Sequence, residues 1–330
     1  MSETPAHTEL PAENTSILPA EPTSDNEAVI DGETHALEWH APVLVRIDEH
    51  TTIPHLLAKR VQRAPRRPLI ARKLEMGSTW QNMTAAEFYE DVQTTAAGLI
   101  GLGLNYGDAI AIMSRTRYEW TLLDFAAWTA GLLPVPIYET SSGEQIEYII
   151  KDADVRAVVT ETVTQRELAL DACHRLGKDD ITVLSLDAEA MQTIQDAGIT
   201  VPRASVAART QALTTDTLAT IVYTSGTTGR PKGTEITHGN FTELALNSHA
   251  WMPEIAMGQD SRLLLFLPLA HVFARFLQVF QLSGEGILGH TPDIKNLLSD
   301  LATFKPSYLL VVPRVLEKIY NSADAKAGRG

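Results

Sequence analysis

The segment from Tyr223 to Gly233, Y-T-S-G-T-T-G-R-P-K-G, combines residue types that can surround a small anion. It holds three glycines, four serine and threonine residues and one lysine, Lys232. Glycines let a backbone turn its N–H groups inward, hydroxyls add short donors, and a lysine adds a mobile positive charge. The segment is therefore predicted to be a phosphate-binding loop.

An ordinary flexible turn is the competing interpretation of this predicted phosphate loop. Ligand binding explains the composition better, because Pro231 directly precedes Lys232 and the glycines and hydroxyls are concentrated within eleven positions. The loop does not follow the Walker pattern, since Lys232 is followed by Gly233 where that pattern needs serine or threonine. The candidate phosphate-binding residues are Thr224, Ser225, Gly226, Thr227, Thr228, Gly229 and Lys232.

Strand-like and helix-like segments alternate on both sides of the loop. Thr84 and Glu87 form a capping box at the start of an amphipathic helix that continues to about Gly101, and Ser141 with Glu144 is predicted to cap another. Strands separated by helices predict an α/β fold with a mostly parallel sheet. Buried strands are predicted at 108–114, 134–138, 155–159, 181–185, 217–224, 263–267 and 308–312, and further helices at 118–132, 240–251, 271–282 and 293–304.

The phosphate loop follows the predicted strand at 217–224. Open α/β sheets bind ligands at the carboxyl ends of their strands, where the backbone N–H groups of a loop are free of strand pairing. This position therefore favours nucleotide binding over a purely structural turn.

The composition divides the chain into three parts. Residues 1–45 contain nine acidic residues, no lysine or arginine and few large apolar residues, which predicts a disordered acidic tail, with an acidic docking arm as the alternative. The apolar pattern weakens between Asp187 and Asp216. We therefore predict one α/β subdomain at 46–200 and a second, which carries the loop, at 201–330.

Charge and cysteine content exclude some classes of function. The formal charge is −14, but residues 46–330 contain 27 basic and 32 acidic residues and have no basic run, so nucleic acid is excluded as a partner. The single cysteine, Cys173, and an amino terminus unlike a signal peptide predict a cytoplasmic location. The apolar run at 263–270 is too short to span a bilayer. Peripheral contact with the inner face of the membrane stays open, as does the oligomeric state.

The loop Y-T-S-G-T-T-G-R-P-K-G resembles the signature loop of the AMP-forming adenylating enzymes, which include acyl-CoA synthetases, firefly luciferase and the adenylation domains of peptide synthetases. Three other stretches are similar to the long-chain fatty acid-CoA ligase branch of these enzymes. They are V-P-I-Y-E-T-S-S at 135–142, L-P-L-A-H-V-F-A-R at 267–275 and V-P-R-V-L-E-K-I-Y at 312–320. The resemblance extends from about Thr52 to the last residues.

The resemblance implies roles for individual residues. Residues from Thr224 to Lys232 are expected to bind the β and γ phosphates of ATP, with the hydroxyl of Thr227 or Thr228 near Mg²⁺. His271 is expected beside the adenylate and the acyl pocket, which makes His271 and Lys232 the catalytic candidates. A buried core histidine is the competing, less favoured interpretation of His271. The apolar helix at 272–282 is a candidate lining of a fatty-acid tunnel, although such a helix is more often part of the core.

The fold that the resemblance implies is the amino-terminal large domain of the adenylate-forming enzymes, with two mostly parallel sheets flanked by helices in layers, incomplete at the carboxy end. The 330 residues contain no counterpart of the family's Thr-Glu segment, its ribose-binding aspartate or its small carboxy-terminal domain with the catalytic lysine. We therefore expect a portion of a longer synthetase that is inactive, or nearly so, by itself.

The expected function of the whole protein is ATP-dependent activation of a long-chain fatty acid, first to an acyl-adenylate and then to acyl-CoA. ATP and coenzyme A are the expected co-substrates, and Mg²⁺ brought with ATP is the only expected metal. Two alternatives remain open on the sequence. One is an adenylating enzyme for another carboxylate, and the other is a non-catalytic nucleotide-binding or interaction module.

Overall fold

The computed structural model describes residues 42–73, 79–224, 231–258, 260–313 and 317. Residues Ile47–Gly330 group into one compact unit, apart from Met1–Arg46, and the fold described here is that of the larger unit. The predicted acidic tail at 1–45 lies almost entirely outside the described residues.

The first of two four-stranded sheets, sheet A, has the strand order β2-β1-β10-β9. Its members β1, β10 and β9 are parallel, whereas β2 pairs with β1 in the antiparallel direction. Sheet A combines strands from both sides of the predicted boundary near residue 200, and that boundary stays a prediction. The strands are β1 (Pro68–Lys73), β2 (Trp80–Thr84), β9 (Arg262–Leu265) and β10 (Ile287–His290).

The second four-stranded sheet, sheet B, is parallel throughout, with the order β4-β3-β5-β6. Its central strand β3 is buried at every position, which explains the unbroken apolar run A-I-A-I-M. The strands are β3 (Ala109–Met113), β4 (Leu133–Ile137), β5 (Val155–Thr160) and β6 (Thr182–Ser185).

A two-stranded antiparallel hairpin of β7 (Leu218–Thr224) and β8 (Lys232–Thr237) carries the ends of the predicted phosphate loop. The sequence predicts β7 but not β8. Most of β8 is exposed and it contains Gly233, so it lacks the apolar pattern that identifies a strand. Its pairing with β7 is what makes it a strand.

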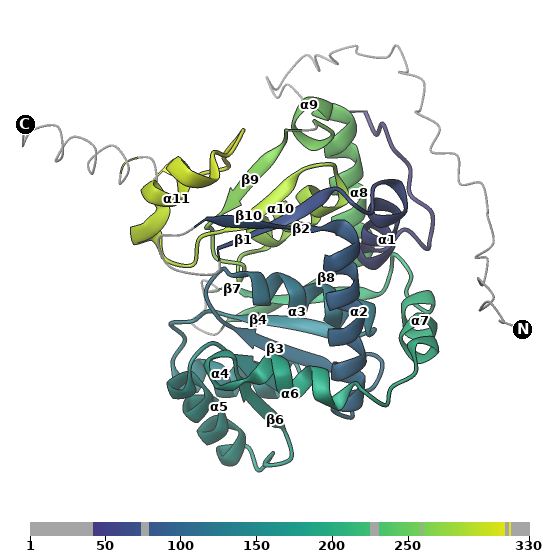
Figure 1. The fold of residues 1–330 in the computed structure, drawn as a ribbon. Coiled ribbons are helices and arrows are strands. Elements are labelled where there is room, and N and C mark those ends of the chain that lie inside the picture. The colour runs from purple at the N-terminus through teal and green to yellow at the C-terminus, as the bar shows by residue number, and fades with distance from the viewer. Residues whose placement is uncertain (1–41, 74–78, 225–230, 259, 314–316, 318–330) are drawn as a thin grey trace, which may run out of the picture. The chain divides into compact units, whose positions relative to one another are not determined.

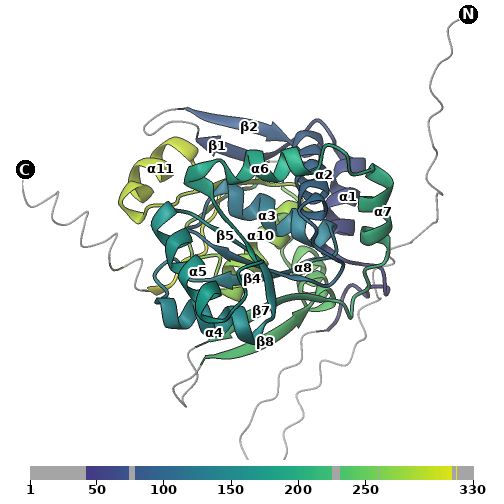
Figure 2. The same cartoon turned by 90° about the horizontal axis from the view of Figure 1, so that it is seen from below.

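Helices fill the space between the two sheets, and others pack against parts of their outer faces (Figure 1). The inner faces of both sheets share one hydrophobic cluster with α1 (Ile53–Arg63), α2 (Ala85–Gly101), α3 (Tyr118–Thr129) and α10 (Val272–Ser283). The outer face of sheet B packs on α4 (Gly143–Asp152) and α5 (Val163–Arg175) (Figure 2), and that of sheet A on α11 (Leu297–Phe304). The predicted α/β class, with two mostly parallel sheets in layers with helices, is confirmed.

The remaining helices are short or lie at the margin of these layers. The segment 187–216, in which the sequence shows no strong pattern, contains two of them, α6 and α7. Each buries only one or two residues, which is why the apolar pattern is weak. These helices are α6 (Ala190–Ala197), α7 (Arg203–Gln211), α8 (His238–Trp251), α9 (Pro253–Ala256) and the 3₁₀ turns Leu186–Ala188 and Ile294–Asn296.

Several local predictions need correction. The helix predicted at 118–132 ends at Thr129, and the helix predicted at 293–304 begins at Leu297, after a 3₁₀ turn. The helix α4 begins one residue later than predicted, with a capping box between Ser142 and Gln145. The segment 308–312 is not a regular strand, because its pairing is limited to one isolated parallel bridge between Leu263 and Tyr308. By contrast, the capping box of Thr84 and Glu87 is present as predicted.

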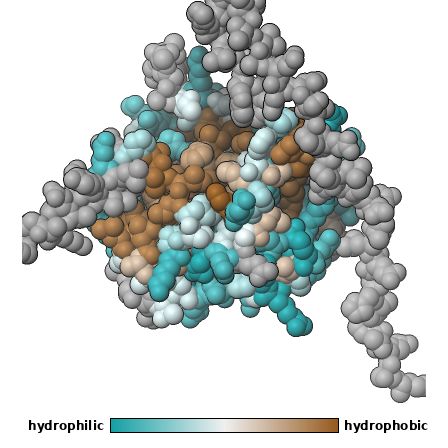
Figure 3. Space-filling view, turned by 90° about the horizontal axis from the view of Figure 1, so that it is seen from above, coloured by the Kyte–Doolittle hydropathy of each residue, from teal (hydrophilic) through white to brown (hydrophobic). Residues whose placement is uncertain are grey.

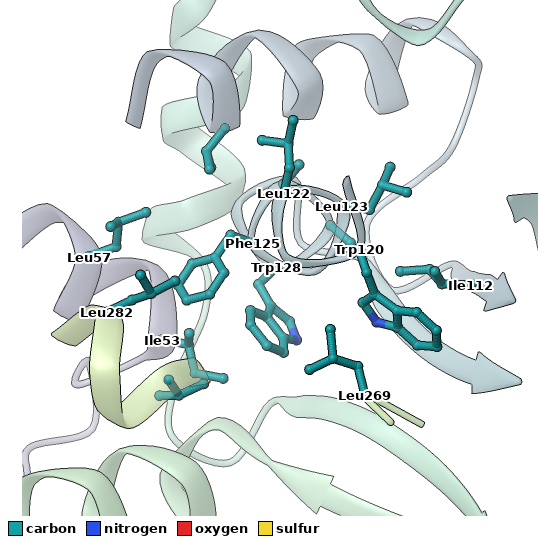
Figure 4. Packing of buried hydrophobic residues seen from close by; sticks show 14 of the residues in the cluster. Ile53, Leu57, Ile112, Trp120, Leu122, Leu123, Phe125, Trp128, Leu269 and Leu282 are labelled. Carbon is teal, nitrogen blue, oxygen red and sulfur yellow. The ribbon is translucent and has the colours of Figure 1, made fainter. Parts of the chain in front are cut away.

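The helix α3 is the centre of the core, where Trp120, Phe125 and Trp128 are surrounded by aliphatic side chains (Figure 4). Nearly every residue of α3 is buried, because sheet A, sheet B and neighbouring helices enclose it. The indole nitrogen of Trp128 donates to the backbone oxygen of Ala219 in β7, over 2.7 Å. The core thus also holds the strand that leads into the predicted phosphate loop.

Hydrophobic side chains cover much of the face that is uppermost in Figure 1, where α9 lies (Figure 3). Exposed large apolar residues at the ends of α9 are Trp251, Met252 and Met257. Within the described ranges, no helix is both long and apolar enough to cross a bilayer. A contiguous exposed apolar patch is typical of a contact face.

Glycine at position 98 allows α2 to cross α6 closely. A Cβ atom there would lie 2.0 Å from the backbone oxygen of Ile194. We expect Gly98→Ala to lower the free energy of unfolding by about 1–3 kcal/mol, since neither backbone can yield without disturbing the core. Thermal unfolding measures this. The matched control is Gly143→Ala in α4, where the nearest atom would be the end of the Arg175 side chain at 3.4 Å, and its stability should not fall.

Two buried histidines make the fold sensitive to acid. Burial lowers the pKa of His238 to about 3 and that of His290 to about 4, whereas an unfolded chain has histidines near the ordinary value of about 6.5. Between these values the unfolded chain binds protons that the folded chain does not. The stability that these two neutral histidines contribute is therefore complete above pH 6.5 and is lost as the pH falls. At pH 5 the loss is on the order of 2 kcal/mol for each histidine.

Unfolding titrations at pH 7.5 and pH 5 measure this dependence. His290→Gln should reduce the loss of stability on acidification, whereas His174→Gln, at a side chain that is 80% exposed, should leave it unchanged. A wild-type stability that is equal at the two pH values would contradict the prediction.

Candidate active site

The candidate site is built from residues at or after the ends of strands. Thr224 is the last residue of β7, Tyr138 follows β4 directly, and His271 precedes α10 in the segment after β9. The hydroxyl of Tyr138 is 2.7 Å from Nδ1 of His271, and the two rings make an edge-to-face contact. Sheet B and the segment after sheet A therefore meet at this point.

The two ends of the predicted phosphate loop lie opposite each other. Lys232 is the first residue of β8 and is the register partner of Thr224 at the end of β7. Both residues are exposed, so they are accessible to a ligand. The other predicted phosphate-binding residues, Ser225, Gly226, Thr227, Thr228 and Gly229, lie outside the described residues, and with them both candidates for contact with Mg²⁺.

The strand β7 is anchored firmly before it reaches the loop. Tyr223 donates to a carboxylate oxygen of Asp152 in α4, over 2.7 Å, and burial together with this carboxylate raises the pKa of Tyr223. Gly233 lies across from Tyr223, and a Cβ atom at this glycine would be 2.8 Å from Ile221. The loop thus begins and ends on a rigid hairpin, which a phosphate site needs if its donors are to be placed in advance.

His271 is exposed, so its interpretation as a buried core histidine is wrong. Its backbone N–H donates to Pro268, and its ring contacts Tyr138. Among the described residues, no hydrogen bond joins His271 to Thr224 or Lys232. The structure thus brings together Thr224 with Lys232, and separately His271 with Tyr138.

Tyr138 was not predicted as a site residue. It belongs to the V-P-I-Y stretch that carries the family resemblance, and that stretch is the only signal in the sequence that points to it. Its position beside His271 depends on two elements more than 130 residues apart in the chain, so the contact is a product of the tertiary structure.

The helix α10 is mainly part of the core, with an exposed first turn. Val272 and Phe273 are 42% and 45% exposed, whereas most of the helix from Ala274 onward is buried. The apolar composition of α10 is thus explained by core packing. Only its first turn offers apolar surface next to His271.

A separate cavity of about 530 Å³ lies at the carboxyl ends of β1, β10, β3 and β5. Arg115 and Arg117 share the carboxylate of Glu161 there, while Arg72 and Arg117 share that of Glu119. Burial acts to raise the pKa of Glu161, but the hydrogen bonds from Arg115 and the charge of Arg117 hold it below its usual value. None of the predicted site residues lines this cavity, and its three arginines pair with the carboxylates of Glu119 and Glu161.

Within the described ranges, no group of three or more histidine, cysteine, aspartate or glutamate side chains is arranged to hold a metal ion. The described residues therefore do not form a resident metal site. A metal that is brought with a nucleotide would depend on the residues of the loop.

Comparisons with known proteins identify the family. Residues 57–329 match the family model described as "AMP-binding enzyme". The long-chain-fatty-acid–CoA ligase FadD15 of Mycobacterium bovis is 36% identical over 298 residues, an alignment that covers 89% of this chain and 49% of the ligase. The chain thus spans about half the length of the curated relatives it matches.

Solved structures agree in fold. VinN superposes with a TM-score of 0.68 at 19% identity, over 86% of this chain and 67% of VinN. ATP-bound MatB from Rhodopseudomonas palustris superposes with a TM-score of 0.65 at 24% identity, over 80% of this chain and 50% of MatB. The matched family, together with the strand–loop–lysine arrangement, leads to one conclusion: this chain belongs to the AMP-binding enzyme family.

Proposed function

We propose that this chain is part of an enzyme that activates a long-chain fatty acid with ATP and transfers the acyl group to coenzyme A. The observation that carries the proposal is the β7–β8 hairpin, which places Thr224 opposite Lys232 at the two ends of a loop rich in glycine and hydroxyl groups. The name of the mycobacterial relative supports the acid–thiol ligase reaction and the long-chain substrate.

In the first step of the proposed reaction, a carboxylate oxygen of the fatty acid attacks the α phosphorus of ATP. The bond from this phosphorus to the bridging oxygen of pyrophosphate breaks, and negative charge grows on the leaving pyrophosphate. Lys232 and the donors of the loop stabilise that charge where it develops. In the second step, the thiol of coenzyme A attacks the acyl carbon of the adenylate and AMP leaves.

Mg²⁺ bound to ATP would neutralise part of the phosphate charge. The hydroxyls of Thr227 and Thr228 are the candidates for a contact with this ion, and they lie outside the described residues. The described residues instead position the loop, because β7 and β8 fix its two ends.

His271 and its surroundings are proposed to bind the reacting carboxyl end of the substrate. Tyr138 holds the His271 ring by a hydrogen bond, and the exposed Val272 and Phe273 offer apolar surface next to it. A fatty acid has a polar end and an apolar chain, which matches this combination.

The test is pyrophosphate release from ATP, measured with fatty acids of different lengths and with aryl and amino acids. It is made on this chain and on the complete product of its gene. Release by the complete product with longer fatty acids is the expected result. Release only with another class of acid would favour an adenylating enzyme for that acid. No release from either protein would favour a nucleotide-binding module without catalysis.

A further inference from the structure

A buried ion pair between Asp124 of α3 and Arg275 of α10 lies beneath the proposed active site. Two hydrogen bonds join them, from Nη2 of Arg275 over 2.5 Å and from Nε over 3.1 Å, and Gln278 donates to the same carboxylate over 2.6 Å. Among the salt bridges of the described residues, this is the one in which both side chains are 0% exposed.

An ion pair at this depth is a poor source of stability. The attraction between the two charges is largely offset by the loss of their hydration, and apolar residues of similar size often stabilise a core equally well. A role in fixing geometry explains the pair better, because the bidentate guanidinium contact allows only one arrangement of the two helices.

The contacts of Arg275 lead to both parts of the proposed site. Its Nη1 donates to Thr220 of β7, four residues before the strand ends at Thr224. Its backbone N–H donates to the carbonyl of His271 over 3.3 Å, so Arg275 also lies one turn below His271 on α10. A single side chain thus joins the strand that leads to the phosphate loop to the helix that begins beside His271.

Neighbouring contacts make the arrangement rigid. Thr220 donates to the carbonyl of Pro134 over 2.8 Å, at the start of the same β4 strand that is followed by Tyr138. The guanidinium carbon of Arg275 is 5.4 Å from the centroid of the Trp128 ring, and Trp128 donates to Ala219, the residue before Thr220. The elements α3, α10, β4 and β7 are therefore held at one point.

A chain of hydrogen bonds also holds the carboxylate of Asp124 in place. Thr121 is 2.9 Å from Oε1 of Gln278 and 2.8 Å from Nε2 of His290. His290 in its neutral form carries a proton on one ring nitrogen and so allows Thr121 to donate to Gln278, whose amide then points its N–H group at Asp124. Each member has a partner, and the carboxylate has little freedom to move.

We propose that Asp124 and Arg275 are positioning residues that fix His271 and the phosphate-loop strand relative to each other. Neither side chain touches substrate. The effect of this link on turnover rests on the proposed function. The link itself, between β7 and the start of α10, does not. A displacement of about 1 Å between reacting groups can reduce a rate about 100-fold, so a rigid link of this kind has a large effect on turnover.

The direct test is backbone hydrogen exchange in the double variant D124L/R275M, which replaces the pair by apolar residues of similar size. Exchange in 218–224 and 271–275 should become about tenfold faster, while the melting temperature stays close to that of the wild type. The matched control is E90A/R203A, an exposed pair outside both segments, which should leave the exchange and the melting temperature unchanged. Unchanged exchange in 218–224 and 271–275 of the folded variant would overturn the proposal.

A second variant keeps the test decisive if the double variant does not fold. Thr220→Val removes the hydroxyl that links Arg275 to β7, together with its hydrogen bond to Pro134, with little change of shape. It should speed exchange in 218–224 but not in sheet A. If exchange in 218–224 is as slow in Thr220→Val as in the wild type, the proposed link between Arg275 and β7 is wrong.

The activity measurement separates this inference from the proposed function. In a protein that releases pyrophosphate, D124L/R275M should lower kcat by about 10- to 100-fold with a much smaller change in KM, because positioning acts on the transition state. Wild-type kcat in that variant would overturn the positioning role. A complete gene product that releases no pyrophosphate, with the exchange result as expected, would overturn the proposed function and leave the link in place.

Discussion

Replacement of Lys232 by alanine is expected to slow pyrophosphate release by about 100-fold or more. The ammonium group is exposed at the first position of β8, opposite Thr224, where it is proposed to stabilise the charge that grows on the leaving pyrophosphate. The loss should be mainly in kcat, since this charge is larger in the transition state than in bound ATP. The measurement is steady-state pyrophosphate release in the protein that turns over.

The fold should not change in this variant, because the Lys232 side chain is exposed and its backbone pairing does not depend on it. Lys151→Ala on α4 is the matched control, since Lys151 is also an exposed lysine, and its rate should equal that of the wild type. Equal rates for wild type and Lys232→Ala would remove Lys232 from the proposed mechanism.

Replacement of Arg275 alone by leucine is expected to lower the free energy of unfolding by about 3–5 kcal/mol. The variant leaves the carboxylate of Asp124 buried without its cation, and only the amide of Gln278 remains from the set of hydrogen bonds. Such a loss is a large part of the total of about 5–15 kcal/mol that is typical of a folded domain. Urea unfolding measures it.

The loss of stability should be large because the Asp124–Arg275 pair is buried, and an exposed ion pair provides the comparison. Arg203 and Glu90 are 77% and 54% exposed, so Arg203→Ala should cost at most about 1 kcal/mol. The double variant D124L/R275M should recover most of the stability that Arg275→Leu loses, because no charge is left unpaired. A loss below about 1 kcal/mol in Arg275→Leu would show that the buried carboxylate does not need its partner.

Much of the local structure was predictable because its interactions close within a few residues. The capping box of Thr84 and Glu87 joins residues three apart, and the β7 strand is an apolar run that ends in a loop of glycines and hydroxyls. The family resemblance also rests on such short stretches. They were sufficient to predict the α/β class and the strand β7 that leads into the predicted phosphate loop.

By itself, then, the sequence determined most of the longer helices and most strands, the α/β class and the family, since these follow from periodicity, caps and contiguous motifs. Only the tertiary structure decided that β1 pairs with β10, that β8 is a strand, and that Tyr138 contacts His271. Only the tertiary structure decided, too, that Asp124 and Arg275 form a buried pair. Each of these contacts joins elements whose partners are selected by packing of the whole core, and no local pattern specifies such a choice.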